Sequence, residues 1–168
     1  MLAGDLNRCI DFPCTDVRHE GNVRPALPTR RDQIRVIMIS AAPPAELPAI
    51  GDDDPVVPPE IFGAFQDAGY DVFSIEGIRR LGVYVTTAVK CPKLGFGLRP
   101  DTIASCSFLL ESELAMFPNV KSILLMGNTA IKAINEIAKR RFGEPAIPTG
   151  SAYAVKGHEY LFAEIRLF

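Results

Sequence analysis

Gly82-Val-Tyr-Val-Thr-Thr-Ala-Val-Lys-Cys-Pro92 begins as a run of apolar and β-branched residues and ends in a lysine, a cysteine and a proline. Residues 83–89 contain no charge, which predicts a strand buried on both faces, as strands are in parallel sheets. Residues 35–40 and 122–127 contain similar short apolar runs, and residues 160–168 are a fourth candidate. We therefore expect four strands in one sheet.

Helical patterns lie between these runs. Residues 59–69 begin with a proline and end with a glycine, residues 100–118 lie between two prolines, and residues 128–143 have isoleucines at three-residue spacing before a closing glycine. Strands that alternate with helices predict a three-layer α/β/α sandwich around a central four-stranded, mainly parallel sheet. Such sheets bind ligands beyond the carboxyl ends of their strands, so functional residues are expected there.

Length and composition fit one folded domain. The chain has 168 residues, 48% of them hydrophobic and 23% charged, with a formal net charge of −2. These values predict a single domain over residues 1–168, and the total charge gives no sign of nucleic-acid binding. Residues 1–34 show no regular period and are expected to form an irregular arm. No window reaches the ~20 apolar residues of a membrane span, which favours a cytoplasmic protein with no membrane partner.

Four cysteines stand at positions 9, 14, 91 and 106. In a cytoplasmic chain, thiols are metal ligands, redox groups or core residues more often than disulfides. Cys106 lies at helical spacing from Ile103 and Leu110, so its side chain is expected on or beside a buried face. Spacing alone leaves two alternatives, a metal site or small core residues at Cys91 and Cys106.

Three segments taken together resemble the uracil-DNA glycosylase superfamily, and most of all its iron–sulfur branch. They are Val36-Ile-Met-Ile-Ser-Ala-Ala-Pro-Pro44, Val83-Tyr-Val-Thr-Thr-Ala-Val-Lys-Cys91, and Cys106 followed by Leu124-Leu-Met-Gly-Asn-Thr-Ala130. The resemblance covers roughly residues 9–135. It implies DNA base excision repair, in which a monomer binds single- or double-stranded DNA, flips out uracil or another damaged base, and hydrolyses its N-glycosidic bond.

The resemblance also implies a role for the cysteines. In the iron–sulfur branch, an N-terminal pair joins two later cysteines in holding a [4Fe–4S] cluster, which implies that the ligands here are Cys9, Cys14, Cys91 and Cys106. The first pair is spaced C-x4-C, whereas C-x2-C is typical of the branch. Four thiolates also suit zinc, so zinc and no metal are the alternatives.

The implied base pocket lies at the ends of the first two strands. Its candidate residues are Ser40, Ala41, Ala42, Pro43, Val56, Phe62 and Thr87. Ala41 stands where the family has an acid that positions water, Thr87 where an asparagine reads the uracil edge, and Val56 where a phenylalanine stacks on the base. The catalytic residue is therefore unassigned, and the candidates for the missing carboxylate are Asp52, Asp53 and Asp54.

Basic residues near the same strand end are candidates for DNA phosphate contacts, namely Lys90, Lys93 and Arg99. His19 and His158 are interpreted as surface histidines. The family's histidine-bearing loop follows the last strand, and the sequence ends at Phe168, about where that loop is expected to begin. The three departures from the family pattern leave an alternative function, a DNA- or nucleobase-binding module that keeps the fold without cleaving the bond.

Overall fold

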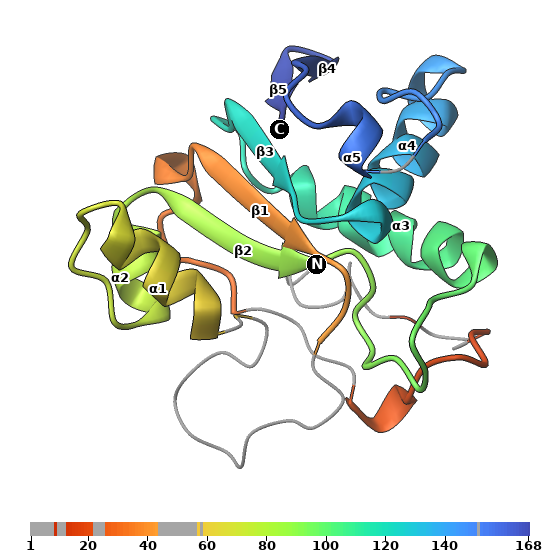
Figure 1. The fold of residues 1–168 in the computed structure, drawn as a ribbon, viewed down its shortest axis with the longest axis horizontal. Coiled ribbons are helices and arrows are strands. Elements are labelled where there is room, and N and C mark those ends of the chain that lie inside the picture. The colour runs from red at the N-terminus through yellow and green to blue at the C-terminus, as the bar shows by residue number, and fades with distance from the viewer. Residues whose placement is uncertain (1–8, 10–12, 22–25, 44–56, 58, 151) are drawn as a thin grey trace.

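The computed structural model of the chain describes residues 9, 13–21, 26–43, 57, 59–150 and 152–168. Its centre is a five-stranded sheet with the strand order β2-β1-β3-β5-β4 (Figure 1). Four strands run parallel, and β4 is antiparallel to β5. The strands are β1 (Val36–Ser40), β2 (Val83–Thr87), β3 (Ser122–Leu125), β4 (Tyr160–Phe162) and β5 (Ile165–Leu167). The predicted α/β architecture is confirmed, with one strand more than expected.

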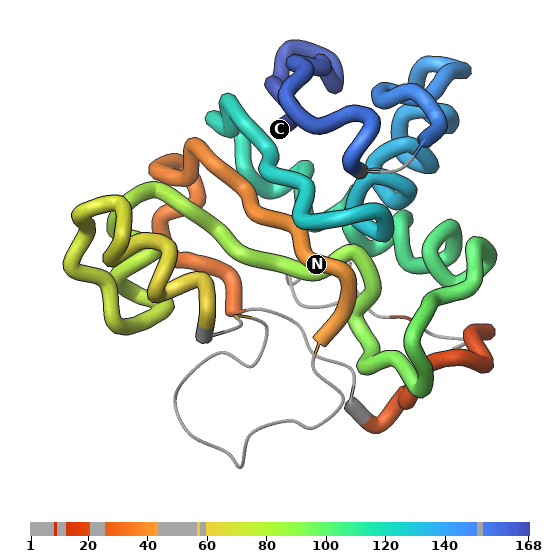
Figure 2. Tube along the Cα trace, viewed as in Figure 1, coloured from red at the N-terminus to blue at the C-terminus, as the bar shows by residue number. Residues whose placement is uncertain are grey.

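Helices cover both faces of the sheet (Figures 1 and 2). On one face, Ile37 of β1 shares a core with Leu110 of α3 and Ile134 of α4. On the other face, Val85 of β2 shares a second core with Ile61 of α1, and α2 also contributes. The helices are α1 (Pro59–Asp67), α2 (Ile75–Arg80), α3 (Pro100–Leu114), α4 (Asn128–Phe142) and α5 (Ala152–Val155), with 3₁₀ turns at His19–Gly21 and Arg31–Gln33.

The register of β1 and β2 brings the ends of these two strands to the same level. Ser40 pairs with Thr87. Pairing continues past both ends, because the Ala88 N–H donates to the Ser40 carbonyl at 2.8 Å and the Val89 N–H donates to the Ala41 carbonyl at 3.0 Å. All residues of β2 are buried, as predicted for a strand with a helical layer on each side. The two predicted halves of the base pocket are therefore neighbours.

The C-terminal run differs from the prediction of one strand. Residues 160–168 form a hairpin in which Tyr160 pairs with Leu167 and Phe162 with Ile165. Ala163, at the turn, has a positive φ of 53°, the left-handed conformation that tight hairpin turns use. Ala163 and Glu164 are not typical turn residues, so the sequence does not mark this turn.

The three predicted helices are confirmed as α1, α3 and α4, whereas the short helices α2 and α5 were not expected. α4 ends at Gly143, whose φ of 84° is the left-handed conformation that favours glycine after a helix. α2 has six residues, too few to show a period, and begins where the Ser74 hydroxyl accepts the Gly77 N–H at 3.1 Å. In the described ranges, no helix has both the length and the apolarity needed to cross a membrane.

Candidate functional site

The carboxyl ends of β1 and β2 form the centre of the candidate site. Ser40, Ala41 and Ala42 are half-buried and Pro43 is buried, and the paired backbone described above holds this segment against residues 87–89. The structure therefore brings together five of the predicted pocket residues. Phe62 lies on α1, where it packs on the core of the α1 and α2 layer. Val56 and Asp52, Asp53 and Asp54 fall outside the described residues.

Thr87 carries a buried hydroxyl without a hydrogen-bond partner among the described residues. Its side chain is fully buried, and in the described part of the chain its Oγ1 has no hydrogen-bond partner. A buried polar group left without a partner costs about 1–3 kcal/mol. Such a group has a donor and an acceptor to offer, and it lies at the carboxyl edge of a parallel sheet, where ligands bind; a ligand would have to displace the residues that now cover it.

Lys90 does not lie where a phosphate could reach it. Its side chain is 4% exposed, and its ammonium donates to Glu113 Oε2 at 2.5 Å, to Thr86 Oγ1 at 2.8 Å and to the Thr87 carbonyl at 2.6 Å. Three bonds use all the donors of an ammonium group. The structure therefore argues against the predicted phosphate contact at Lys90 and assigns this lysine to a buried polar network.

Glu113 is the other centre of this network, and it was not predicted from the sequence. Its Oε1 accepts the Tyr84 hydroxyl at 2.6 Å and the Thr86 hydroxyl at 2.8 Å. The available signal was a carboxylate three residues after Leu110, on the apolar face of the predicted helix. The network ties the end of β2 to α3 and holds the backbone at Thr87 in place.

Lys93 and Arg99 are exposed, on the loop that connects β2 to α3. Asp16 of the N-terminal arm anchors this loop at both ends: its carbonyl accepts the Leu94 N–H at 2.9 Å, and its Oδ2 accepts the Arg99 N–H at 2.6 Å. Its Oδ1 accepts the hydroxyl of Thr102. The arm and the loop thus form one unit beside the sheet edge (Figure 1).

We expect this arm to loosen in acid. Burial raises the pKa of Asp16, but hydrogen bonds from Arg99 and Thr102 outweigh burial and hold the pKa below its ordinary value. A carboxylate with a lowered folded-state pKa adds stability above its unfolded-state pKa of about 3.9, and this contribution disappears as the pH falls through the folded value. Amide exchange at Leu94 and Arg99, corrected for intrinsic rates, should lose protection between about pH 5 and about pH 2.5. Asp16→Asn should lack this dependence; equal protection at both pH values in the unaltered chain would contradict it.

No disulfide joins the four cysteines, which are half-buried at Cys9 and Cys14 and buried at Cys91 and Cys106. Cys106 Sγ accepts the backbone N–H of Lys90 at 3.4 Å. Burial raises the pKa of Cys106 to about 11, with repulsion from Cys91 and Cys14 adding to the increase. Burial also raises the pKa of Cys14, repulsion from Cys9 adds to this, and a hydrogen bond with Thr102 opposes it. These pairwise interactions link the four thiols in one corner of the molecule.

The donor atoms suit a thiolate-bound metal, but they do not form a finished site. Thr102, which contacts Cys14, lies one helical turn before Cys106 on α3, and a cavity of about 180 Å³ opens beside Cys14 and Thr102. Within the residues that the structure describes, no three His, Cys, Asp or Glu side chains are grouped closely enough to hold a metal ion. The chemistry fits a metal centre, whereas the described geometry does not yet show one.

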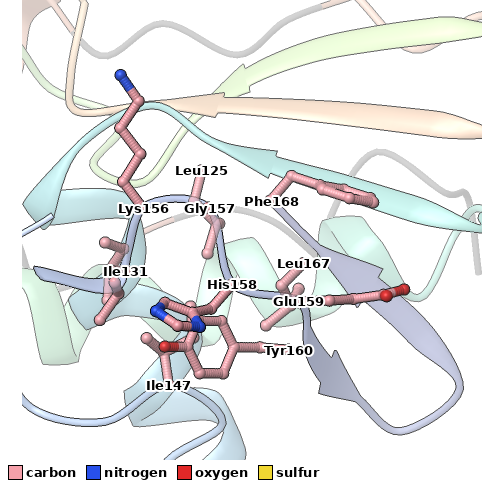
Figure 3. Close-up of a pocket in the computed structure, with 11 residues that line it drawn as sticks. Leu125, Ile131, Ile147, Lys156, Gly157, His158, Glu159, Tyr160, Leu167 and Phe168 are labelled. Atoms are coloured by element: carbon pink, nitrogen blue, oxygen red, sulfur yellow. The ribbon is translucent and has the colours of Figure 1, made fainter. Parts of the chain in front are cut away.

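A larger cavity of about 640 Å³ lies at the carboxyl ends of β3 and β5 (Figure 3). Its wall is mostly apolar and includes Leu125, Ile131, Ile147 and Leu167. His158 is exposed, as predicted, and also lines this cavity, with its ring centroid 6.4 Å from that of Tyr160. The cavity could not be predicted from the sequence because its walls come from separate segments of the chain.

His19 is half-buried in the arm, and its Nε2 lies 2.8 Å from the Cys14 carbonyl. The interpretation of His19 as a surface histidine is therefore wrong in part. The contact fixes the short 3₁₀ turn at residues 19–21 against the segment that carries Cys14. A metal role for His19 gains nothing from it, since the contact is to a backbone oxygen.

Two comparisons with known proteins agree with this geometry. The model of the uracil DNA glycosylase superfamily matches residues 30–164. A type-5 uracil-DNA glycosylase of Thermus thermophilus is 27% identical over 88 residues, which are 52% of this chain and 40% of the relative. The match to this relative therefore spans less than half of the relative's length. The residues that the family model matches include β1 and β2, and with them the strand ends at Ser40 and Thr87.

Proposed function

The chain belongs to the uracil DNA glycosylase superfamily, and on that basis we propose that it binds DNA and hydrolyses the N-glycosidic bond of uracil or another damaged base. The flipped base enters at the carboxyl ends of β1 and β2, between residues 40–43 and Thr87. The observation that carries this proposal is the buried, unpartnered hydroxyl of Thr87 at that edge, to which the described residues offer no hydrogen bond. A glycosylase must read a flipped base through hydrogen bonds to its edge, and this hydroxyl has the donor and the acceptor to make one.

Excision assays test the reaction. The protein is incubated with end-labelled oligonucleotides that carry uracil, single-stranded and double-stranded, and abasic sites are scored after alkaline cleavage. Product above the level without protein supports the glycosylase. Thr87→Asn, which installs an amide able to donate and accept together, is expected to raise uracil excision. No product with any damaged base, from protein that still binds the oligonucleotides, would reject hydrolysis.

The second candidate function is a DNA- or nucleobase-binding module, and the side chain at position 41 favours it. Ala41 cannot position or activate water, whereas a carboxylate can. If the reaction occurs, the carboxylate comes from another residue, and the candidates from the sequence are Asp52, Asp53 and Asp54. Converting all three to asparagine should abolish excision by a catalytic chain. A binding module instead binds the oligonucleotides and forms no product, both in the unaltered chain and in the triple variant.

Thr87→Val gives a prediction for the pocket that does not depend on catalysis. Valine has the shape of threonine without the hydroxyl, so it removes a buried polar group that has no partner in the described residues. We expect the free energy of unfolding to rise by about 1 kcal/mol, and the affinity for a uracil-containing oligonucleotide to fall about 3- to 10-fold. Urea denaturation and fluorescence anisotropy measure the two effects.

Thr87→Ser, which keeps a hydroxyl, is the matched control and should retain most of the affinity. If the free energy of unfolding of Thr87→Val instead falls by about 1 kcal/mol, the loss is that expected for an ordinary buried hydrogen bond. The hydroxyl would then have a protein partner. Unchanged affinity in Thr87→Val would remove Thr87 from the base pocket.

We also propose that Cys9, Cys14, Cys91 and Cys106 hold a [4Fe–4S] cluster, which stabilises the junction of the arm, the β2 exit and α3. Support comes from the proximity of the thiols, since Cys9 lies near enough to affect the pKa of Cys14, and Cys14 and Cys91 that of Cys106, and from the backbone N–H that reaches Cys106 Sγ. Hydrogen bonds to thiolate sulfur accompany such clusters and tune them. Zinc is the alternative for the same four donors.

Cys91→Ser should lower bound iron from about four atoms per chain to near zero after anaerobic purification. Metal analysis measures iron and zinc together, so a zinc site gives about one zinc per chain and no iron. Ser112→Ala, at an exposed position of α3 that does not line the cavity beside Cys14, is the control and should leave the metal content unchanged. Full iron retention by Cys91→Ser would exclude Cys91 as a ligand.

A further inference from the structure

The loop between β2 and α3 presents a bare aromatic ring to solvent. Phe96 is completely exposed and is the most exposed of the large hydrophobic side chains in the described residues. It lies between Gly95 and Gly97, and a Cβ added at either glycine would meet no atom within 4 Å. Both faces of the ring are therefore open. Moving a phenylalanine side chain from water to an apolar contact is favourable by roughly 1.5–3 kcal/mol. A partner that covers this ring would gain that free energy.

The base of this loop is fixed, although its tip is open. Asp16 binds the backbone at Leu94 and at Arg99, on both sides of Phe96. Val17 pairs with Lys93 in an antiparallel bridge, and the Arg18 N–H donates to the Pro92 carbonyl at 2.8 Å. Figures 1 and 2 show the loop beside the arm, below the carboxyl end of β2. A loop anchored at both ends holds its tip away from the core at little further entropic cost.

Charge around the ring indicates the kind of partner. Lys93 and Arg99 flank Phe96 along the loop, and both are exposed. The Lys93 ammonium lies 3.5 Å from the Phe96 carbonyl. Arg99 approaches Asp101 only at 3.9 Å, with both side chains mostly exposed, so this ion pair is weak. An aromatic ring between two cations matches single-stranded nucleic acid, whose bases stack on the ring while its phosphates meet the cations.

We propose that Phe96 is a base-stacking contact for DNA, with Lys93 and Arg99 bound to the flanking phosphates. This inference rests on the proposed function, because DNA is the ligand in both. The loop leaves β2 only a few residues after Thr87 and starts from the same edge of the sheet. A strand held by Phe96 would therefore pass beside the pocket that receives the flipped base.

Another exposed phenylalanine provides a matched control. Phe73 is 74% exposed in the connection between α1 and α2. The charged residues nearest to it in sequence are Asp71 and Glu76, both exposed, which repel phosphate. Arg79 and Arg80 lie further along the chain, within 4.0 Å of Glu76. It has the same chemistry as Phe96 in a setting that disfavours nucleic acid.

The chain contains no tryptophan, so Phe96→Trp and Phe73→Trp each create a single fluorescent reporter. A uracil-containing single-stranded oligonucleotide is titrated into each variant at low and at moderate salt. Stacking on a base quenches indole, so we expect the emission of Phe96→Trp to fall by half or more, with an affinity close to that of the unaltered chain. Phe73→Trp should bind equally well without quenching. Phe96→Ala should weaken binding about 5- to 150-fold, which corresponds to about 1–3 kcal/mol for one stacked base.

The outcomes separate this inference from the proposed function. Binding by the unaltered chain with no effect of Phe96→Ala and no quenching of Phe96→Trp overturns the stacking contact and leaves the proposed function standing. No DNA binding by the unaltered chain overturns both.

A blue shift of Phe96→Trp on vesicles of phosphatidylcholine and phosphatidylglycerol, without quenching by DNA, identifies a membrane contact and overturns the inference. Concentration-dependent self-association that Phe96→Ala abolishes, again without quenching by DNA, overturns it in favour of a second copy. Urea denaturation should be the same for Phe96→Ala and the unaltered chain, since the ring has no packing to lose.

Discussion

Replacing Glu113 with leucine is expected to lower the free energy of unfolding by about 3–5 kcal/mol, because it leaves the ammonium of Lys90 buried without its counter-charge. Lys90 and Glu113 are 4% and 3% exposed and lie 2.5 Å apart, so water cannot replace the lost carboxylate. The hydroxyls of Tyr84 and Thr86 lose an acceptor in the same variant. Urea denaturation followed by circular dichroism measures the effect. We expect a lower midpoint with an unchanged slope.

Two further variants distinguish an unpaired charge from lost packing. Combining Lys90→Met with Glu113→Leu removes both charges at similar volume, and should recover the part of the loss that comes from the unpaired charge. The part that comes from the Tyr84 and Thr86 hydroxyls remains, because they still lack an acceptor. Glu111→Ala, on the same helix, breaks ion pairs with Arg140 and Arg141 that are partly exposed, and should cost no more than about 1 kcal/mol. If Glu113→Leu cost no more than Glu111→Ala, the buried network would not be a stabilising feature of this chain.

The same network connects stability to the site. Lys90 donates to the Thr87 carbonyl through its side chain and to Cys106 Sγ through its backbone N–H. One residue thus joins the proposed base pocket, the proposed cluster corner and α3. A variant that loosens Lys90 should disturb the pocket and the cysteines together, whereas a change on the α1 and α2 side should leave both intact.

The strands could be predicted because burial on both faces leaves a continuous apolar run, as in residues 83–89. The hairpin at residues 160–168 could not, because each of its strands has only three residues and β5 depends on pairing with β3, which is distant in sequence. The pocket edge at Ser40 and Thr87 follows from the rule that parallel strands place their carboxyl ends together. That rule needs no knowledge of side-chain packing.

Lys90 shows where local reasoning fails. A lysine after a strand usually lies in solvent, and its partner Glu113 is 23 residues away on another element. Only the packing of α3 on the sheet brings them together. The cavity at the β3 and β5 ends was missed for a similar reason, since Leu125, Ile147 and Leu167 are far apart in sequence. Phe96 is the opposite case, because its glycine neighbours were visible in the sequence but its exposure was not.

Replacing Asn135 with leucine is expected to lower the free energy of unfolding by about 2–4 kcal/mol, because two buried backbone groups lose their partners. Asn135 of α4 is 7% exposed, and its amide donates to the Ile147 carbonyl at 2.8 Å and accepts the Ile147 N–H at 2.9 Å. This pair of bonds fastens the segment after α4 to the helix, and Ile147 lines the larger cavity. Urea denaturation measures the loss, and amide exchange at Ile147 should rise with it.

Asn135→Asp tests the same contact through pH. A carboxylate still accepts the Ile147 N–H but cannot donate to the Ile147 carbonyl, whereas a protonated carboxyl can do both. Folding therefore favours the protonated form and raises the folded-state pKa of the new carboxyl above its unfolded value of about 3.9. The added stability is present below that unfolded value and is lost as the pH rises through the folded one, so the deficit relative to the unaltered chain should be smaller at about pH 4 than at about pH 8.

Asn119→Asp is the control, because Asn119 donates to the Asp32 carbonyl at an exposed position, and its deficit should stay within about 0.5 kcal/mol at either pH. A stability deficit of Asn135→Asp that did not change with pH would contradict this account. It would mean that water replaces the Asn135 amide as the donor to the Ile147 carbonyl, and that apolar packing alone holds the segment that lines the cavity.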